Sequence, residues 1–223
     1  MFDDALAELT LTVSPAGTGV KRVPWWALVS ATGAPVVLVV GLTVAASRQP
    51  AGYDPVRDTI SALAARGATD RWVMTAALVL LGLSHATTAA GMSPGRRPGR
   101  CILAGGGVAT VLVAAFAQPV RGNSVAHTIA AAMAFGALSI WPLFAAGRRN
   151  ATPLLTRLPS VGATAVMLGF VLWFVLELHG GQRGLAERAA ACSQALWPLA
   201  VVLSNRLASS APAAAGTSSL AIE

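Results

Sequence analysis

Histidine and carboxylate side chains are the residues of this 223-residue chain that could activate water. His127 and His179, together with Glu177 or Asp58, could take a proton from water directly or hold a metal ion that does so. These four residues are the candidate catalytic groups of a hydrolase. No HExxH, GxSxG or phosphatase-like motif accompanies them, so the pattern indicates no particular reaction.

His85 raises a different chemistry, because it lies inside an apolar segment where haem could bind. It is about fourteen residues from the start of that segment, roughly 20 Å at the helical rise, whereas His127 and His179 are expected near the other surface. Haem held by His85 and either of them is therefore disfavoured, and His127 with His179 is the only plausible haem-binding pair. We expect no cofactor and no bound metal, and an interior hydrogen bond between His85 and Ser84 or Thr88.

The composition is that of an integral membrane protein. Hydrophobic residues make up 55% of the chain and charged residues only 11%, with a mean hydropathy of +0.64. The net charge of +7 comes from arginines placed singly or in pairs at the ends of apolar runs. This placement suits lipid headgroups better than nucleic acid, so membrane lipids are the expected partners and no nucleic acid is expected. The sequence indicates no protein partner.

Six apolar segments are long enough to cross a bilayer. They are Pro24–Ala46, Trp72–Gly91, Cys101–Ala117, Ser124–Ala146, Pro159–Leu178 and Leu185–Leu207. We predict an all-α, polytopic membrane protein with a single six-helix domain over residues 24–207. Residues 1–23 are predicted to form a mobile N-terminal tail, and residues 208–223 a disordered C-terminal tail. The triplet Gly105-Gly106-Gly107 is predicted to let another helix approach closely.

A polar stretch between the first two segments is predicted to form a short amphipathic helix. Asp54 can cap its N-terminus, Pro55 suits its first position, and Gly67 can end it. Its apolar face is Val56, Ile60 and Leu63, and its polar face holds Asp58 and Ser61. We expect this helix to lie flat at the membrane surface, over the mouth of the bundle.

Alternate loops of a six-pass chain lie at the same face, so the polar residues of three loops are expected to converge there. The predicted ligand-binding residues are Tyr53, Arg57, Asp58, Ser61, Arg121, Asn123, His127, Glu177 and Arg183. Their favoured function is binding or sensing of a lipid or small amphiphile, since the arginine fork matches carboxylate and phosphate groups. The same arginines, with Arg188, could instead pair with Asp58, Glu177 and Glu187 and only hold the loops together. A membrane-embedded hydrolase using His127, His179 and a carboxylate is the alternative function, and a small-solute transporter the third.

The distribution of basic residues among the loops predicts the orientation of the protein in the membrane. The loops after the second and fourth segments contain arginines and no acidic residue, whereas the opposite loops mix both charges. By the positive-inside rule the purely basic loops and both termini are cytoplasmic, which makes the polar face extracytoplasmic. We therefore expect a multi-pass protein of a bacterial plasma membrane.

Three stretches of the chain resemble a family of prokaryotic membrane proteins. They are YDPVRDTISALAARGATDRWVM after the first segment, GNSVAHTIAAAMAF at the start of the fourth, and GLAERAAACSQALWPLAVVL in the sixth. Together with the core Ile60-Ser61-x-Leu63, the downstream Gly67 and His127, they resemble the domain of unknown function 998 family (DUF998). This resemblance covers roughly residues 24–207 and implies about six transmembrane helices, without implying a reaction.

Overall fold

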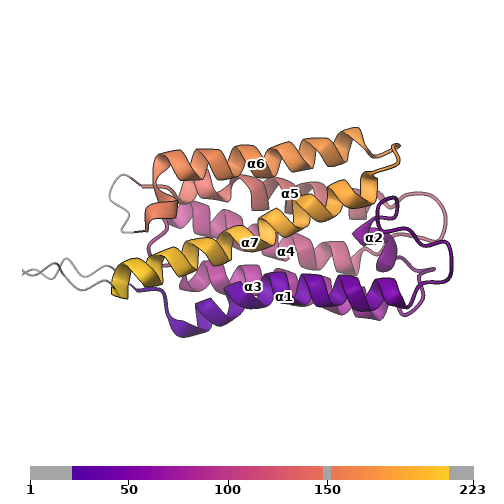
Figure 1. Cartoon of the computed structure of the whole chain (residues 1–223), viewed down its shortest axis with the longest axis horizontal. Helices are drawn as coiled ribbons and strands as arrows, with labels where there is room; N and C mark the ends of the chain where they lie inside the picture. The colour runs from indigo at the N-terminus through magenta and orange to yellow at the C-terminus, as the bar shows by residue number, and fades with distance from the viewer. Residues whose placement is uncertain (1–21, 148–151, 211–223) are drawn as a thin grey trace, which may run out of the picture.

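The computed structural model describes residues 22–147 and 152–210, and within these ranges the regular structure is helical. The elements in chain order are α1 (Trp25–Ser47), α2 (Ile60–Leu63), α3 (Trp72–Gly91), α4 (Arg97–Ala115), α5 (Val125–Ala145), the 3-10 helix η1 (Pro153–Leu155), α6 (Arg157–Leu176) and α7 (Arg183–Ser210). The long helices run side by side along the longest axis of the molecule (Figure 1).

The long helices form a closed ring. Each of α1, α3, α4, α5 and α6 packs against the next, and α7 closes the ring by packing against α6 and α1. The Arg22 side chain donates a hydrogen bond to Ser210 Oγ at 3.3 Å, so the described chain starts and finishes at the same end of the bundle. Helix α2 lies at the opposite end, beside the first turns of α7 (Figure 1).

Five described helices are long and apolar enough to cross a membrane, namely α1, α3, α4, α5 and α6, with mean hydropathies between 1.4 and 2.1. Their outward surface is apolar, as shown by Leu158 of α6, which is 81% exposed. Such a surface suits hydrocarbon, and the chain is a helical, multi-pass membrane protein. The sixth predicted crossing corresponds to α7, whose buried Glu187, Gln194 and Asn205 lower its hydropathy. This crossing stays a prediction.

The predicted tails fall mostly outside the described residues, since 1–21 and 211–223 are not among them. Of the predicted N-terminal tail, Val23 is described and is buried, and its amide donates to Asn205 Oδ1 at 2.9 Å. Helix α7 continues to Ser210, so it includes the first three residues of the predicted C-terminal tail.

Glycines allow the closest helix contacts. A Cβ atom at Gly82 of α3 would overlap the carbonyl oxygen of Gly107, and one at Gly106 would lie 2.7 Å from Leu138 Cδ2. The predicted close approach at the glycine triplet is thus confirmed at Gly106 and Gly107, whereas Gly105 faces open space.

Candidate functional site

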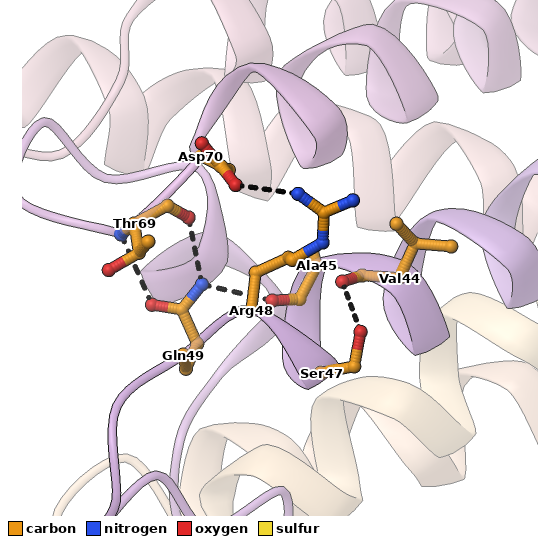
Figure 2. Close-up of polar contacts among 7 residues, drawn as sticks. All are labelled: Val44, Ala45, Ser47, Arg48, Gln49, Thr69 and Asp70. Atoms are coloured by element: carbon orange, nitrogen blue, oxygen red, sulfur yellow. Dashed lines mark hydrogen bonds and ion pairs between the residues drawn. The ribbon is translucent and has the colours of Figure 1, made fainter.

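The loop between α1 and α3 contributes much of the predicted site, and polar contacts close it at its base. Arg48 Nη1 lies 3.0 Å from Asp70 Oδ2, and the Gln49 side chain both donates to Thr69 O and accepts from Thr69 N (Figure 2). Asp70 has a φ of +48°, a left-handed conformation that aspartate adopts more readily than most residues. The loop therefore leaves and rejoins the bundle at one place.

The helix in this loop begins later than predicted. Asp54 Oδ1 accepts a hydrogen bond from Val56 N at 2.8 Å, so this side chain builds a turn and does not cap the helix. That bond holds the pKa of the Asp54 carboxyl below its usual range. Thr59 is the actual N-cap, since its Oγ1 accepts from Ala62 N at 3.1 Å. Helix α2 is only one turn long, Ile60–Leu63.

The predicted amphipathic pattern holds only in part. Ile60 and Leu63 are buried, but Val56 lies in the preceding turn and is 40% exposed. The helix ends four residues before Gly67, whose φ is not in the left-handed region. Ser61, predicted on the polar face opposite Ile60 and Leu63, hydrogen-bonds to groups of the bundle. The predicted apolar and polar faces assumed a helix of several turns, and they do not apply to a helix of one turn.

Glu187 of α7 attaches α2 to the bundle. It is 3% exposed, and its two carboxylate oxygens take different partners. Oε2 accepts from Ile60 N, and Oε1 lies within hydrogen-bond distance of Ser61 Oγ, at 3.0 Å. Ile60 N belongs to the first turn of α2, where amides have no partner within the helix. The carboxylate thus supplies an acceptor that a one-turn helix cannot provide.

His127, in the first turn of α5, extends this contact. It is 4% exposed, its Nδ1 lies 3.0 Å from Phe116 O, and its Nε2 lies 3.2 Å from Ser61 Oγ. A carbonyl oxygen only accepts hydrogen bonds, so Nδ1 carries a hydrogen. Glu187, Ser61 and His127 therefore form a hydrogen-bonded chain, the Glu–Ser–His chain, that joins α7, α2 and α5.

The Glu–Ser–His chain needs one more proton than its neutral histidine, serine and carboxylate possess. Its two links, Glu187 to Ser61 and Ser61 to His127, require two hydrogens, and the Ser61 hydroxyl supplies one. Since the Nδ1 hydrogen is used on Phe116, the second comes either from a protonated Glu187 or from an imidazolium at His127. The chain can thus hold a proton and shift it between an acid and a base.

Two arginines of α7 connect the α1–α3 loop to this helix by hydrogen bonds. Arg188 donates to Asp58 O at 2.7 Å and to the Tyr53 hydroxyl, and Arg183 Nε donates to Arg57 O at 2.8 Å. Burial raises the pKa of Tyr53, opposed by the positive charge of Arg188, so its hydroxyl stays protonated. These guanidinium groups are engaged with oxygens of the loop.

A close backbone contact accompanies these bonds. Leu185 N donates to Val56 O at 3.0 Å. A Cβ atom at Gly184 would overlap Asp58 O and lie 2.7 Å from Pro55 O. Only glycine lets the first turn of α7 come this near to the loop.

Some predicted residues lie apart from this cluster. Arg121 and Asn123 are exposed in the loop between α4 and α5, and His179 is exposed in the loop between α6 and α7. Glu177 is half-buried, and its carboxylate accepts from Gln182 N, in its own loop, at 3.0 Å. The predicted residues whose side chains take part in these contacts are Tyr53, Ser61, His127 and Arg183. Arg57 and Asp58 take part through their backbone carbonyls, and the exposed Arg57 side chain pairs with Asp54 at 3.0 Å.

A cavity of about 50 Å³ lies next to the Glu–Ser–His chain. This volume has room for on the order of three water molecules. Its polar lining is Ser61 and Glu187 near α2, then Thr110, Gln194 and His85. The larger apolar residues of its wall are Leu38, Ile60, Leu78, Leu81, Val113, Phe135 and Leu138.

Of the polar residues that line this cavity, the predicted ligand-binding set contains Ser61 and lacks His85, Thr110, Glu187 and Gln194. The sequence predicts Glu187 as a pairing partner for arginine, and it predicts no role for Gln194. The two are seven residues apart, which places them on one face of a helix about 10 Å apart along its axis. Polar residues at such spacing in an apolar segment favour a polar cavity between helices. This seven-residue spacing is the sequence signal from which a polar cavity next to α7 could have been predicted.

The order in which Glu187, Ser61 and His127 are hydrogen-bonded limits the reactions that they could catalyse. In a serine–histidine–acid triad the acid contacts histidine, whereas here Glu187 contacts Ser61 and a backbone carbonyl orients His127. Among the residues the structure describes, no three His, Cys, Asp or Glu side chains are grouped closely enough to hold a metal ion. The arrangement can bind a hydrogen-bonding group and relay a proton.

The family comparison matches most of this bundle. The model of the family described as "Protein of unknown function (DUF998)" matches residues 31–204, which include α2, the Glu–Ser–His chain and the cavity residues. No curated protein and no solved structure is similar enough to the chain to count as a match. With the family model matching well over half of its length, the chain belongs to the DUF998 family.

Proposed function

We propose that this protein binds a small amphiphile between its helices at the α2 end of the bundle. The observation that supports the proposal is the cavity itself, whose wall is apolar except for Ser61 and Glu187 near α2 and a few polar groups along α3, α4 and α7. At about 50 Å³ this cavity would admit only the polar end of the ligand, beside Ser61, and the carbon atoms next to it, among the leucines.

The contacts of the charged residues narrow the ligand class. Arg183 and Arg188 donate to oxygens of the α1–α3 loop, so they are not the groups that face the cavity. The cavity presents a carboxyl group instead, and a carboxyl favours a ligand that donates hydrogen bonds. We therefore propose a hydroxyl- or amine-bearing amphiphile and not a phosphate.

Filling the cavity is expected to remove the ligand. Ala131 lines the cavity, whereas its neighbour Ala132 faces outward on the same helix. Protein with Ala131→Phe, purified in mild detergent and extracted with organic solvent, should retain at least several-fold less of the co-purified amphiphile in mass spectrometry than the wild type. Ala132→Phe is the control and should retain it. Equal retention in both variants would show that the ligand lies elsewhere.

We also propose that the polar face is extracytoplasmic, in a plasma membrane of bacterial type, with cytoplasmic termini and α7 as the sixth crossing. Support comes from the opposite end of the bundle, where Arg96, Arg97 and Arg100 lie at the start of α4 and neither this turn nor the loop before it contains an acidic residue.

Thiol labelling tests this orientation. The native cysteines Cys101 and Cys192 are free, and both would first be replaced by serine. An exposed Ala51→Cys in the α1–α3 loop should react with an impermeant maleimide in intact cells, whereas Ser93→Cys, exposed at the other end, should react only after permeabilisation. The reverse pattern would invert the orientation.

The hydrolase is retained as a second proposal because of one contact. Ser61 Oγ lies 3.2 Å from His127 Nε2, which is the contact an activated serine needs. The position of Glu187 on the serine side weighs against it, and so does His179, which is exposed and belongs to a different loop. Among the described residues, no contact favours a transporter.

A further inference from the structure

A groove at the end of the bundle opposite α2 has no role in the proposed function. It lies between the last turns of α3 and the first turns of α4, and its volume is about 300 Å³. Ligand pockets in proteins start at about this size. Four alanines, two arginines and Cys101 line the groove. It is therefore large enough to hold part of a ligand, with small apolar side chains along it and positive charge beside them.

The two arginines differ in how far they are engaged. Arg100 donates from Nε to Ala89 O at 2.9 Å and from Nη2 to Ala90 O at 2.6 Å, and these carbonyls belong to the last turn of α3, where a helix lacks donors of its own. The side chain of Arg97 is exposed and has no hydrogen-bond or ion-pair partner within residues 22–147 and 152–210. The acidic residues of these ranges all lie at the α2 end, and they are Asp54, Asp58, Asp70, Glu177 and Glu187. The charge of Arg97 is thus left for an anion from outside.

The groove joins this charge to the apolar outer surface. Arg97 is the first residue of α4, one of the helices that could cross a membrane, so it lies at the level where such a helix meets lipid headgroups. Ala86 and Ala104 line the groove further from this end. One turn beyond them on the same helix faces are Leu83 and Val108, which are both more than half exposed. A phosphate followed by hydrocarbon matches this order of groups.

We propose that this groove binds an anionic phospholipid, with the phosphate at Arg97 and the start of one acyl chain over the alanines. The guanidinium group suits a phosphate, because it offers several N–H donors in one plane. Arg96, which is exposed beside Arg97, and Arg100 add positive charge. A headgroup with a net negative charge is therefore favoured over one that carries a choline cation. This site is separate from the cavity at the α2 end.

Competition between two phospholipids that differ only in the headgroup tests the role of Arg97. The full chain in mild detergent would be mixed with equal amounts of phosphatidylglycerol and phosphatidylcholine with the same acyl chains, and native mass spectrometry would give the ratio of the two lipids in one-to-one complexes. The wild type should prefer phosphatidylglycerol. Arg97→Gln should lower this preference about fivefold, the effect expected of one arginine near a lipid surface. Arg97→Lys, which keeps the charge, should retain part of it.

A matched control separates the groove from the overall charge of the protein. Arg66 is also exposed and its side chain has no partner among the described residues, but it lies at the α2 end. Arg66→Gln changes the net charge as Arg97→Gln does and should leave the preference unchanged. A preference that survives Arg97→Gln, or that Arg66→Gln lowers equally, would overturn the proposed site. Equal retention of the two lipids by the wild type would also overturn it.

The apolar part of the groove has its own test. Ala90→Leu puts a larger side chain into the groove and should lower the amount of phosphatidylglycerol retained several-fold, whereas Ala76→Leu, at an exposed position of α3 outside the groove, should not. Glycerol 3-phosphate, which has the phosphate without acyl chains, should not compete at equal concentration. If it competes, the groove binds a soluble phosphate and not a lipid. Ala131→Phe, which fills the cavity at the α2 end, should leave the preference unchanged, so the two proposed sites can fail independently.

Discussion

Glu187→Ala is expected to lower the free energy of unfolding by about 2–4 kcal/mol, since it removes the hydrogen-bond partner of one buried group, at roughly 1–3 kcal/mol, and of one half-buried group, at less than that. The groups are Ile60 N and the Ser61 hydroxyl. Water in the adjoining cavity would replace the carboxylate only in part, because Glu187 and Ile60 are both buried. Helix α2 should therefore loosen from the bundle, although Ile60 and Leu63 still favour burial.

Glu187→Gln is the discriminating companion variant, and its expected cost is below about 1 kcal/mol. The amide oxygen can accept from Ile60 N, and the amide NH₂ can donate to Ser61 Oγ. The Ser61 hydroxyl is then free to donate to His127 Nε2, while Nδ1 keeps its bond to Phe116 O. Glutamine thus supplies the additional hydrogen that the Glu–Ser–His chain requires, without any charge.

The two variants are compared by apparent Tm in one detergent, and by amide hydrogen exchange of residues 59–65. Glu187→Ala should lower the Tm and accelerate exchange in this segment, whereas Glu187→Gln should leave both near the wild-type values. If glutamine is as harmful as alanine, a fixed negative charge at Glu187 is needed, and a protonated carboxyl cannot be the state of the folded protein.

Much of the fold was predictable because it depends on local features of the chain. The second predicted segment, Trp72–Gly91, coincides with α3, since apolar residues fill it and polar loops bound it on both sides. The α2 region was predicted less well, because Asp54 and Thr59 are both competent caps. The choice between them depends on Glu187, 127 residues after Ile60, and no local pattern contains that contact.

The candidate site was predictable to the level of loops but not of side chains. Alternation of loops is enough to bring His127 near Ser61, and the structure places them in contact. The alternation of loops does not determine the conformation within each loop. Glu177 bonds to Gln182 within its own loop, and His179 remains exposed. Likewise, the rotation of α7 that buries Glu187 is set by packing against two other helices.

Gly184→Ala is expected to destabilise the protein by about 1–3 kcal/mol, the usual cost of inserting a group into a packed site. Helix propensity alone predicts the opposite, since alanine is favoured over glycine by about 1 kcal/mol in a helix. Steric overlap should dominate, because the obstructing atoms, Asp58 O and Pro55 O, belong to backbone that cannot rotate away. Moving them would strain the bond from Leu185 N to Val56 O.

Two controls separate overlap from propensity. Gly136 lies within α5 and Gly181 just before α7, and a Cβ atom at either would have open space around it. Gly136→Ala should raise the apparent Tm slightly, Gly181→Ala should leave it nearly unchanged, and Gly184→Ala should lower it and accelerate amide exchange at residues 55–61. If Gly184→Ala behaves like Gly136→Ala, the α1–α3 loop does not pack closely on α7, and the position of Ser61 beside Glu187 loses its support.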